Sequence, residues 1–146
     1  MKVEIKKLRE QARIPQRGSL SAAGADLYAC MEEESVKLAA GETKLIGTGL
    51  AMAIPEGCFG GIFARSGLAA KEGLRPANCV GVIDSDYRGE VKVALHNDSD
   101  KERVITQGER IAQLVVLPYL APEFVEKDEL DETVRGEGGF GHTGNT

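Results

Sequence analysis

The sequence predicts an all-β fold, built as one domain from short antiparallel strands with one short helix. Strand-like segments recur about every ten residues with glycine or proline between them, as in sandwiches and barrels. Hydrophobic residues make up 42% of the 146 residues, but aromatic residues only 5%, so the core must be mainly aliphatic. The 18 glycines predict many turns. Because long helical patterns are missing, a doubly wound α/β fold is excluded.

The predicted strands follow one another along the chain with polar connections between them. Residues 2–8 alternate apolar and polar side chains, and a polar loop with Pro15, Gly18 and Ser19 follows. A run of small residues then places Asp26 at the start of the next strand-like segment, over residues 22–29. Further strands are predicted at residues 35–38, 43–46, 49–54, 58–64, 104–105 and 109–117, and near Phe124.

The only predicted helix covers residues 66–72 and is barely two turns long. Ser66 is its expected N-cap. Arg65-Ser66-Gly67 stands where a strand enters this helix, so amides, a hydroxyl and a guanidinium can face one anion there. Capping by Ser66 and pairing of Arg65 with a carboxylate explain these residues equally well.

Residues 78–90 are predicted to form a β-hairpin. An apolar run over residues 80–83 leads into the turn-forming cluster Asp84-Ser85-Asp86, and residues 90–95 alternate as a returning strand. Two carboxylates and Tyr87 therefore share one bend. Acidic residues at turns more often bond their own backbone than form a site, so the hairpin alone favours the simple turn.

The C-terminal residues differ in composition from the rest. Residues 126–132 form a mostly acidic linker, which we expect to be extended and mobile. Residues 135–144 hold five glycines among Arg135, Phe140, His142 and Thr143, a pattern typical of a phosphate clamp as well as of a disordered end. Phe140 favours the clamp, because stacking one aromatic side chain on a base contributes about 1–3 kcal/mol.

Charge and composition exclude several functions. The net charge of −5 opposes binding to a nucleic-acid backbone, and no segment reaches the roughly 20 apolar residues of a membrane span. Two histidines far apart do not provide a zinc site. Three cysteines without CxxC spacing, and no apolar leader, predict a reduced, cytoplasmic protein. Gln113, an amide in an apolar stretch, needs hydrogen-bond partners.

Taken together, these stretches resemble the five ordered motifs of the trimeric dUTPase family, over nearly the whole chain. The motifs are Ala23-Gly24-Ala25-Asp26-Leu27, Arg65-Ser66-Gly67, residues 78–89, residues 108–114 and residues 135–144. The resemblance implies a jelly-roll-like antiparallel β-barrel of the β-clip type, over residues 1–125. A flexible C-terminal arm, residues 126–146, would close over the active site. It also implies a homotrimer whose active sites are shared between subunits.

The implied activity is hydrolysis of dUTP to dUMP and pyrophosphate, which limits uracil incorporation into DNA and supplies dUMP for thymidylate synthesis. Asp84 would be the general base that activates the water attacking the α-phosphate. Asp26 would contact Mg²⁺ through water, with the ion held mainly by the triphosphate. One subunit would hold phosphate oxygens through Arg65, Ser66, Gly67 and Gln113. A third subunit would close over these oxygens with Arg135, Gly141, His142 and Thr143.

The resemblance assigns base and sugar selection to the hairpin of a second subunit. Asn78 and backbone groups at Gly81, Val82, Ile83 and Asp84 and near Lys92 would read the uracil edge, while Tyr87 would exclude a 2'-hydroxyl and Phe140 would stack on the base. His142 departs from the pattern, because the family more often has serine there; histidine can still donate to phosphate.

Two other functions were weighed. A dCTP deaminase, a relative that in bifunctional members also hydrolyses the triphosphate, shares the implied fold, but Phe140 and the hairpin from Asp84 to Tyr87 favour dUTPase. A non-catalytic binding module of the same fold predicts gaps among the polar site positions, and the motifs show none.

Overall fold

The structure, a computed structural model, describes residues 1–139 and forms an antiparallel β-fold with one short helical segment in that range. Its strands are β1 (Glu4–Lys7), β2 (Gln16–Arg17), β3 (Ala25–Tyr28), β4 (Ser35–Leu38), β5 (Thr43–Gly47), β6 (Leu50–Ala53), β7 (Cys58–Phe63), β8 (Leu74–Pro76), β9 (Gly81–Ile83), β10 (Lys92–Asn97), β11 (Arg103–Thr106) and β12 (Arg110–Pro118). The helical segment is η1 (Leu68–Glu72), a π-helical turn.

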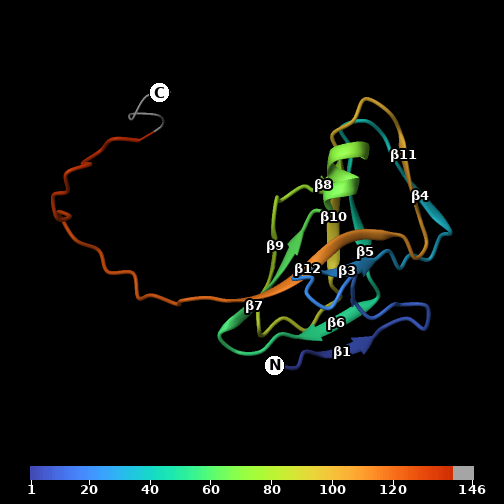
Figure 1. The fold of residues 1–146 in the computed structure, drawn as a ribbon, viewed down its shortest axis with the longest axis horizontal. Helices are drawn as coiled ribbons and strands as arrows, with labels where there is room; N and C mark the ends of the chain where they lie inside the picture. The colour runs from blue at the N-terminus through green and yellow to red at the C-terminus, as the bar shows by residue number, and fades with distance from the viewer. Residues whose placement is uncertain (140–146) are drawn as a thin grey trace.

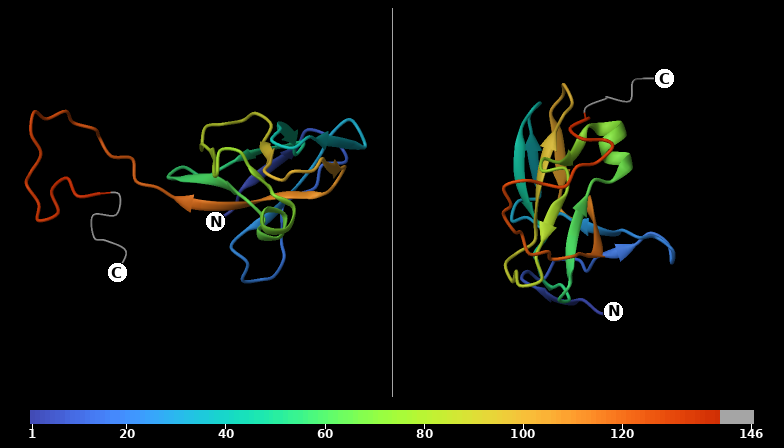
Figure 2. Two further views of the ribbon diagram at one scale, coloured as in Figure 1. Left: turned by 90° about the horizontal axis from the view of Figure 1, so that it is seen from above. Right: turned by 90° about the vertical axis from the view of Figure 1, so that its left-hand side faces the viewer.

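The strands form four antiparallel sheets around one core. The largest has the order β2-β3-β12-β7-β9, and the three-stranded sheet has the order β5-β10-β8. Two pairs, β1-β6 and β11-β4, complete the barrel, and η1 lies at one end of it (Figures 1 and 2). This architecture confirms the predicted all-β, jelly-roll-like fold.

The core is aliphatic, as the low aromatic content predicts. On β10 the side chains alternate, so that Val93, Leu95 and Asn97 are buried while Lys92 is exposed. Fully buried side chains from other strands and their flanks meet these, among them Leu27, Leu38, Leu50, Met52, Leu74, Ile105 and Ile111. The packed strands therefore form a rigid support for the loops between them.

The predicted hairpin at residues 78–90 is wrong in its pairing. β9 pairs with β7, whereas β10 pairs with β5 and β8, so the two strands belong to different sheets. Both strands and the intervening bend are present, but the bend connects two sheets. Local alternation predicts a strand but not its partner, because pairing depends on residues distant in sequence.

Three further local predictions need correction. Ser66 and Gly67 are helical, but no side chain caps the segment, so Ser66 is not the expected capping residue. Phe124 is 92% exposed and lies outside any strand. The strands β2 and β8 were not predicted, because β2 has two polar residues and β8 contains Pro76. Pro76 is tolerated because β8 is an edge strand.

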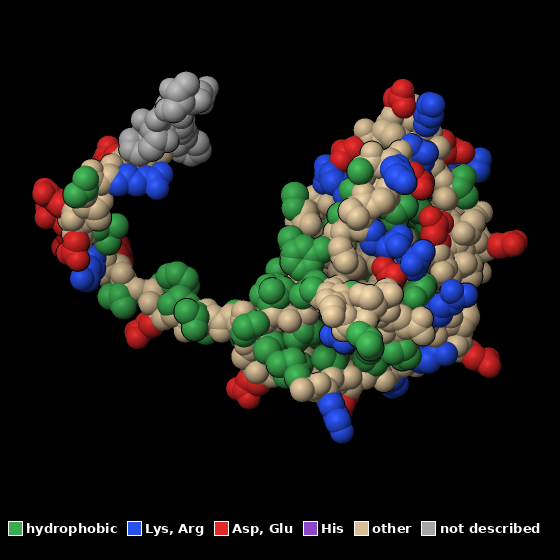
Figure 3. Space-filling model, viewed as in Figure 1, with side chains coloured by type: hydrophobic (Ala, Val, Ile, Leu, Met, Phe, Trp, Pro, Cys, Tyr) green, Lys and Arg blue, Asp and Glu red, His purple; other side chains and the backbone are tan. Residues whose placement is uncertain are grey.

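From Leu120 onward the described chain leaves the barrel without strand or helix (Figure 1). Figure 3 shows hydrophobic side chains gathered on the barrel where this segment departs and continuing along its first part. Leu120, Phe124 and Val125 are 94%, 92% and 69% exposed. A single chain thus leaves an apolar surface uncovered, which is typical of an assembly interface.

Candidate active site

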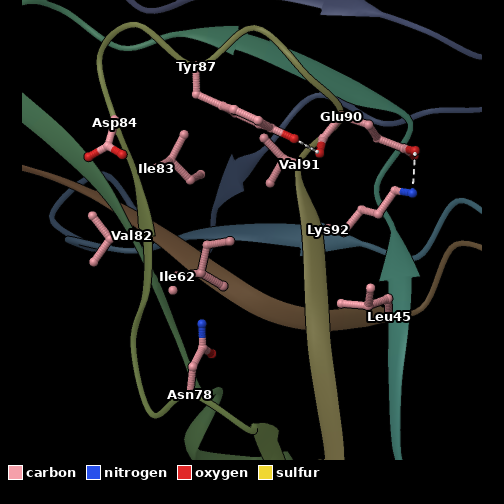
Figure 4. A pocket seen from close by; sticks show the side chains of 11 residues that line it. Leu45, Ile62, Asn78, Val82, Ile83, Asp84, Tyr87, Glu90, Val91 and Lys92 are labelled. Atoms are coloured by element: carbon pink, nitrogen blue, oxygen red, sulfur yellow. Dashed lines mark hydrogen bonds and ion pairs between the residues drawn. The ribbon is translucent and has the colours of Figure 1, made fainter.

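A cavity of about 260 Å³ opens where β9 and β10 diverge into their two sheets (Figure 4). Its apolar wall is formed by Ile62, Ile83 and Val91, and Lys92 and Asn78 stand on opposite sides of it. Because β9 is an edge strand, its backbone groups on the cavity side remain free to bind a ligand. The cavity is slightly smaller than the roughly 300–1,000 Å³ of typical ligand pockets.

Gly81 lies in the cavity lining, where β9 approaches β7 closely. A Cβ at this position would lie 3.2 Å from Ile62 Cβ and 3.5 Å from Asn78 Nδ2, so a side chain would fill the cavity floor. Asn78 itself is exposed, and Cys79 beside it has φ 60°, which turns the backbone sharply into β9. The bend thus aims the Asn78 amide at the same cavity that Val82 and Ile83 line.

The loop between β9 and β10 places Tyr87 and Asp84 at the cavity. The Tyr87 hydroxyl donates to the Glu90 carbonyl oxygen at 2.9 Å, which lays the ring along the cavity edge (Figure 4). Asp84 lines the rim and is exposed. Within residues 1–139 its carboxylate makes no hydrogen bond or ion pair with another side chain or with the backbone. Asp86 does not line the cavity.

A second polar group lies on the five-stranded sheet around Asp26. Gln113 on β12 stands opposite Asp26 on β3 and Phe63 on β7, so the register of three strands brings the end of β7 to Asp26. Asp26 Oδ1 accepts a hydrogen bond from Arg65 Nε at 2.8 Å, and Oδ2 accepts one from Arg110 Nη1 at 3.2 Å. With two guanidinium groups and one carboxylate, this group carries net positive charge and suits an anion.

The Gln113 amide is held in place within the same group. Its Nε2 donates to the Ala64 carbonyl oxygen at 2.9 Å, so the partner expected for this half-buried amide is present. Gly24 provides the room, because a Cβ there would lie 2.2 Å from Gln113 Oε1. Ser66 and Gly67 are exposed directly after Arg65. The side-chain pairing of Arg65 weighed from the sequence is present, with Asp26 as the partner.

The single chain brings the predicted site residues together in two separate groups. The lining of the cavity contains Asn78, Gly81, Val82, Ile83, Asp84, Tyr87 and Lys92. It does not contain Asp26, Arg65 or Gln113. Arg135 lies on the extended arm, where its Nε donates to the Gly138 carbonyl oxygen at 2.7 Å. Phe140, Gly141, His142 and Thr143 lie outside the described residues.

Sequence reasoning missed Arg110, Glu90 and Arg9. Arg110 falls within the fourth motif, so its basic side chain near Gln113 was an available signal. In the sequence, Glu90 looks like an ordinary polar position of an alternating strand. The residues around Arg9 form no motif that would indicate its contact with Glu90. Their contacts join residues far apart in sequence, since Arg9 and Glu90 are separated by 81 positions.

Within residues 1–139, the side chains near Asp26 offer few ligands to a metal ion. Residues 1–139 contain no group of three or more His, Cys, Asp or Glu side chains that could hold one. Both oxygens of Asp26 already accept hydrogen bonds from arginine. A hydrated magnesium ion that arrives on a triphosphate fits such a site, because it needs few protein ligands.

No helix in the described residues could cross a membrane.

Comparisons with known proteins agree on one family. A sequence model of the dUTPase family matches residues 10–144. Deoxyuridine 5'-triphosphate nucleotidohydrolases of Hydrogenobaculum sp. and Nautilia profundicola are 49% and 50% identical over 144 residues, with 99% of each chain covered. The Arabidopsis thaliana relative is 48% identical over 97% of this chain and 82% of its own. A solved dUTPase of Staphylococcus bacteriophage 80alpha with dUpNHpp is 32% identical, with a TM-score of 0.87 and 98% of both chains covered.

With these comparisons, the fold places the chain among all-β nucleotide hydrolases. The chain belongs to the dUTPase family, and its reaction is the hydrolysis of dUTP to dUMP and pyrophosphate. The fold and activity implied by the sequence motifs are therefore confirmed, and the deaminase alternative is not favoured.

Proposed function

We propose that the chain hydrolyses dUTP at active sites that neighbouring subunits of a homotrimer share, with Asp84 as the general base and Mg²⁺ on the triphosphate. The observation that carries this proposal is the separation of the nucleoside cavity from the Asp26–Arg65–Gln113 group. A whole dUTP needs both, so in this proposal the cavity of one chain works together with the Asp26–Arg65–Gln113 group of another. The uncovered apolar surface around Leu120 and Phe124 supports assembly.

In this proposal the cavity between β9 and β10 selects the nucleoside. The Asn78 amide and free backbone groups of β9 bind the uracil edge, where cytosine presents the opposite pattern of donors and acceptors. Tyr87 stands at the cavity edge (Figure 4), and in this proposal its ring excludes a 2'-hydroxyl. The close approach of Gly81 to Ile62 leaves a tight floor, which excludes the methyl group of thymine.

The phosphates bind the Asp26 group of another subunit. Arg65, oriented by Asp26, and Gln113, oriented by the Ala64 carbonyl, donate to phosphate oxygens with the backbone at Ser66 and Gly67. Such oriented donors cost little reorganisation when charge develops in the transition state. Asp84 takes a proton from a water that attacks the α-phosphate in line, and pyrophosphate leaves. Bound Mg²⁺ would add charge neutralisation on the phosphate oxygens, with Asp26 touching its waters.

The arm completes the proposed site. Residues 1–125 form the barrel, and residues 126–146 form an arm whose Arg135, Gly141, His142 and Thr143 bind the phosphates while Phe140 stacks on the base. The exposed path of residues 126–137 is consistent with an arm that acts on another subunit. A cytoplasmic location is also proposed, supported by three free cysteines.

Pyrophosphate release from a panel of dUTP, dCTP, dTTP, dATP, dGTP and UTP, with and without magnesium, tests the assignment. We expect rapid release from dUTP alone. Ammonia release from dCTP without prior dUTP hydrolysis would instead identify a deaminase.

Replacing Tyr87 by alanine is expected to admit UTP. Because the ring blocks the 2'-hydroxyl, the ratio of kcat/KM for dUTP to that for UTP should fall about 10- to 100-fold. Tyr119→Ala, which removes a similarly exposed tyrosine outside the cavity lining, is the control. An unchanged ratio in Tyr87→Ala would remove this residue from sugar selection.

Chelation of magnesium is expected to lower kcat by at least about tenfold without changing the thermal midpoint of the nucleotide-free protein. The reason is that residues 1–139 provide no cluster of acidic, histidine or cysteine ligands that would hold the ion on its own. Differential scanning fluorimetry with and without EDTA measures the second effect. A marked loss of stability on chelation would show a resident metal site and contradict the proposal.

A further inference from the structure

An ion pair between Arg9 and Glu90 lies behind the loop that carries Tyr87. Arg9 Nη1 is 2.8 Å from Glu90 Oε1, and the Glu90 side chain is only 14% exposed. The mechanism above uses neither residue. A carboxylate that is mostly withdrawn from solvent is costly unless it is paired, so its position beside the cavity needs an explanation.

The Glu90 carboxylate joins three separate segments of the chain. Its Oε1 also accepts a hydrogen bond from the Gly49 backbone N–H at 2.9 Å, in the turn between β5 and β6. Arg9 Nη1 donates further to the Cys30 carbonyl oxygen at 2.9 Å, and the charge of Glu90 raises the pKa of Arg9. On its other side, Glu90 Oε2 lies 3.7 Å from Lys92 Nζ (Figure 4). Glu90, two residues before β10, is therefore fixed to Arg9 and to the turn between β5 and β6.

The backbone leaves room for this pair through Gly47 at the end of β5. A Cβ at Gly47 would lie 2.6 Å from Glu90 Oε1 and 3.3 Å from Arg9 Nη1. Any side chain at this position would displace the carboxylate. Gly47 also pairs with Lys92, so the opening lies directly against the first residue of β10.

Glu90 is at the same time the residue that holds Tyr87. The Tyr87 hydroxyl donates to the Glu90 carbonyl oxygen at 2.9 Å, and the Tyr87 N–H donates to the Asp84 carbonyl oxygen at 3.2 Å. The ring is thus attached to a residue whose side chain is anchored in the barrel. A shift of the Glu90 backbone would move the tyrosine hydroxyl and the ring with it.

We propose that Arg9 and Glu90 are a positioning pair that sets where the Tyr87 ring stands in the cavity, and so sets the discrimination between deoxyribose and ribose. This inference rests on the proposed role of Tyr87 in sugar selection. Neither side chain need touch the substrate. Both act through the loop between β9 and β10.

The test compares Glu90→Ala and Arg9→Ala with the unaltered chain, measuring kcat and KM for dUTP and for UTP. We expect both variants to lower the dUTP-to-UTP ratio of kcat/KM by about tenfold, mainly through better use of UTP. Glu90→Gln keeps an acceptor for both Arg9 and the Gly49 N–H, and we expect it to retain most of the discrimination. Arg9→Ala serves as the test if Glu90→Ala does not fold, because Arg9 is the more exposed partner.

Glu102→Ala is the matched control, because it removes a 3.0 Å ion pair with Lys37 away from the cavity. A purely structural role for Glu90 would lower the thermal midpoint and leave the ratio unchanged. Suppose that the unaltered chain prefers dUTP and that Tyr87→Ala accepts UTP. An unchanged ratio in the Glu90 and Arg9 variants would then overturn the positioning role and leave the proposed function intact. An unaltered chain that does not hydrolyse dUTP would instead overturn the proposed function.

Discussion

Replacing Asp84 by asparagine is expected to leave dUTP bound and to lower kcat by about 100- to 10,000-fold. The side chain keeps its size at the rim of the cavity, but an amide does not accept a proton from the attacking water. Single-turnover kinetics with the purified variant measures the chemical step, and titration with a non-hydrolysable dUTP analogue measures binding. The expected signature is a large fall in kcat with a nearly unchanged Kd.

Asp86→Asn is the matched control, because Asp86 lies two positions away in the same loop but does not line the cavity. It should retain nearly all activity. Near-normal turnover in Asp84→Asn would show that another group activates the water.

Truncation after Thr133 is expected to lower kcat/KM for dUTP by about 100-fold or more while the barrel remains folded. The deletion removes Arg135 and the glycine-rich motif, the proposed phosphate clamp, but no described strand, because β12 ends at Pro118. Steady-state kinetics measures the loss, and size-exclusion chromatography with light scattering checks that the assembly persists.

Truncation after Gly144 is the control for this deletion, because it retains the whole motif over residues 135–144 and should remain active. A chain truncated after Thr133 that keeps its rate would contradict the clamp.

Much of the barrel follows from local patterns, but the partners of its strands do not. The segment at residues 35–38 matches β4, and alternation predicts most of β10. The same alternation predicts a hairpin that does not form, because β9 pairs with β7 and β10 pairs with β5. Two strands that are adjacent in sequence thereby leave a cavity between them, and this cavity is one of the two parts of the candidate site.

In the candidate site too, the sequence predicts which residues take part but not which of them are in contact. Asp26, Arg65 and Gln113 are recognisable as motif residues in the sequence, but their meeting depends on the register of β3, β12 and β7. Asp26 and Arg65 are 39 positions apart, so no local rule predicts that one orients the other. The contact between Arg110 and Asp26 follows only from this geometry.

The most direct test of shared active sites is a subunit-mixing experiment with Asp84→Asn and Arg65→Ala, each expected to be nearly inactive alone. Co-expressed with different tags and purified through both tags, they form mixed assemblies. If Asp84 and Arg65 act together from different chains of a trimer, each mixed trimer contains one site in which both residues are intact, and activity should return to about a third of the unaltered level. If each chain carries a complete site, the mixed assemblies stay as inactive as their parents, and that result would contradict the account.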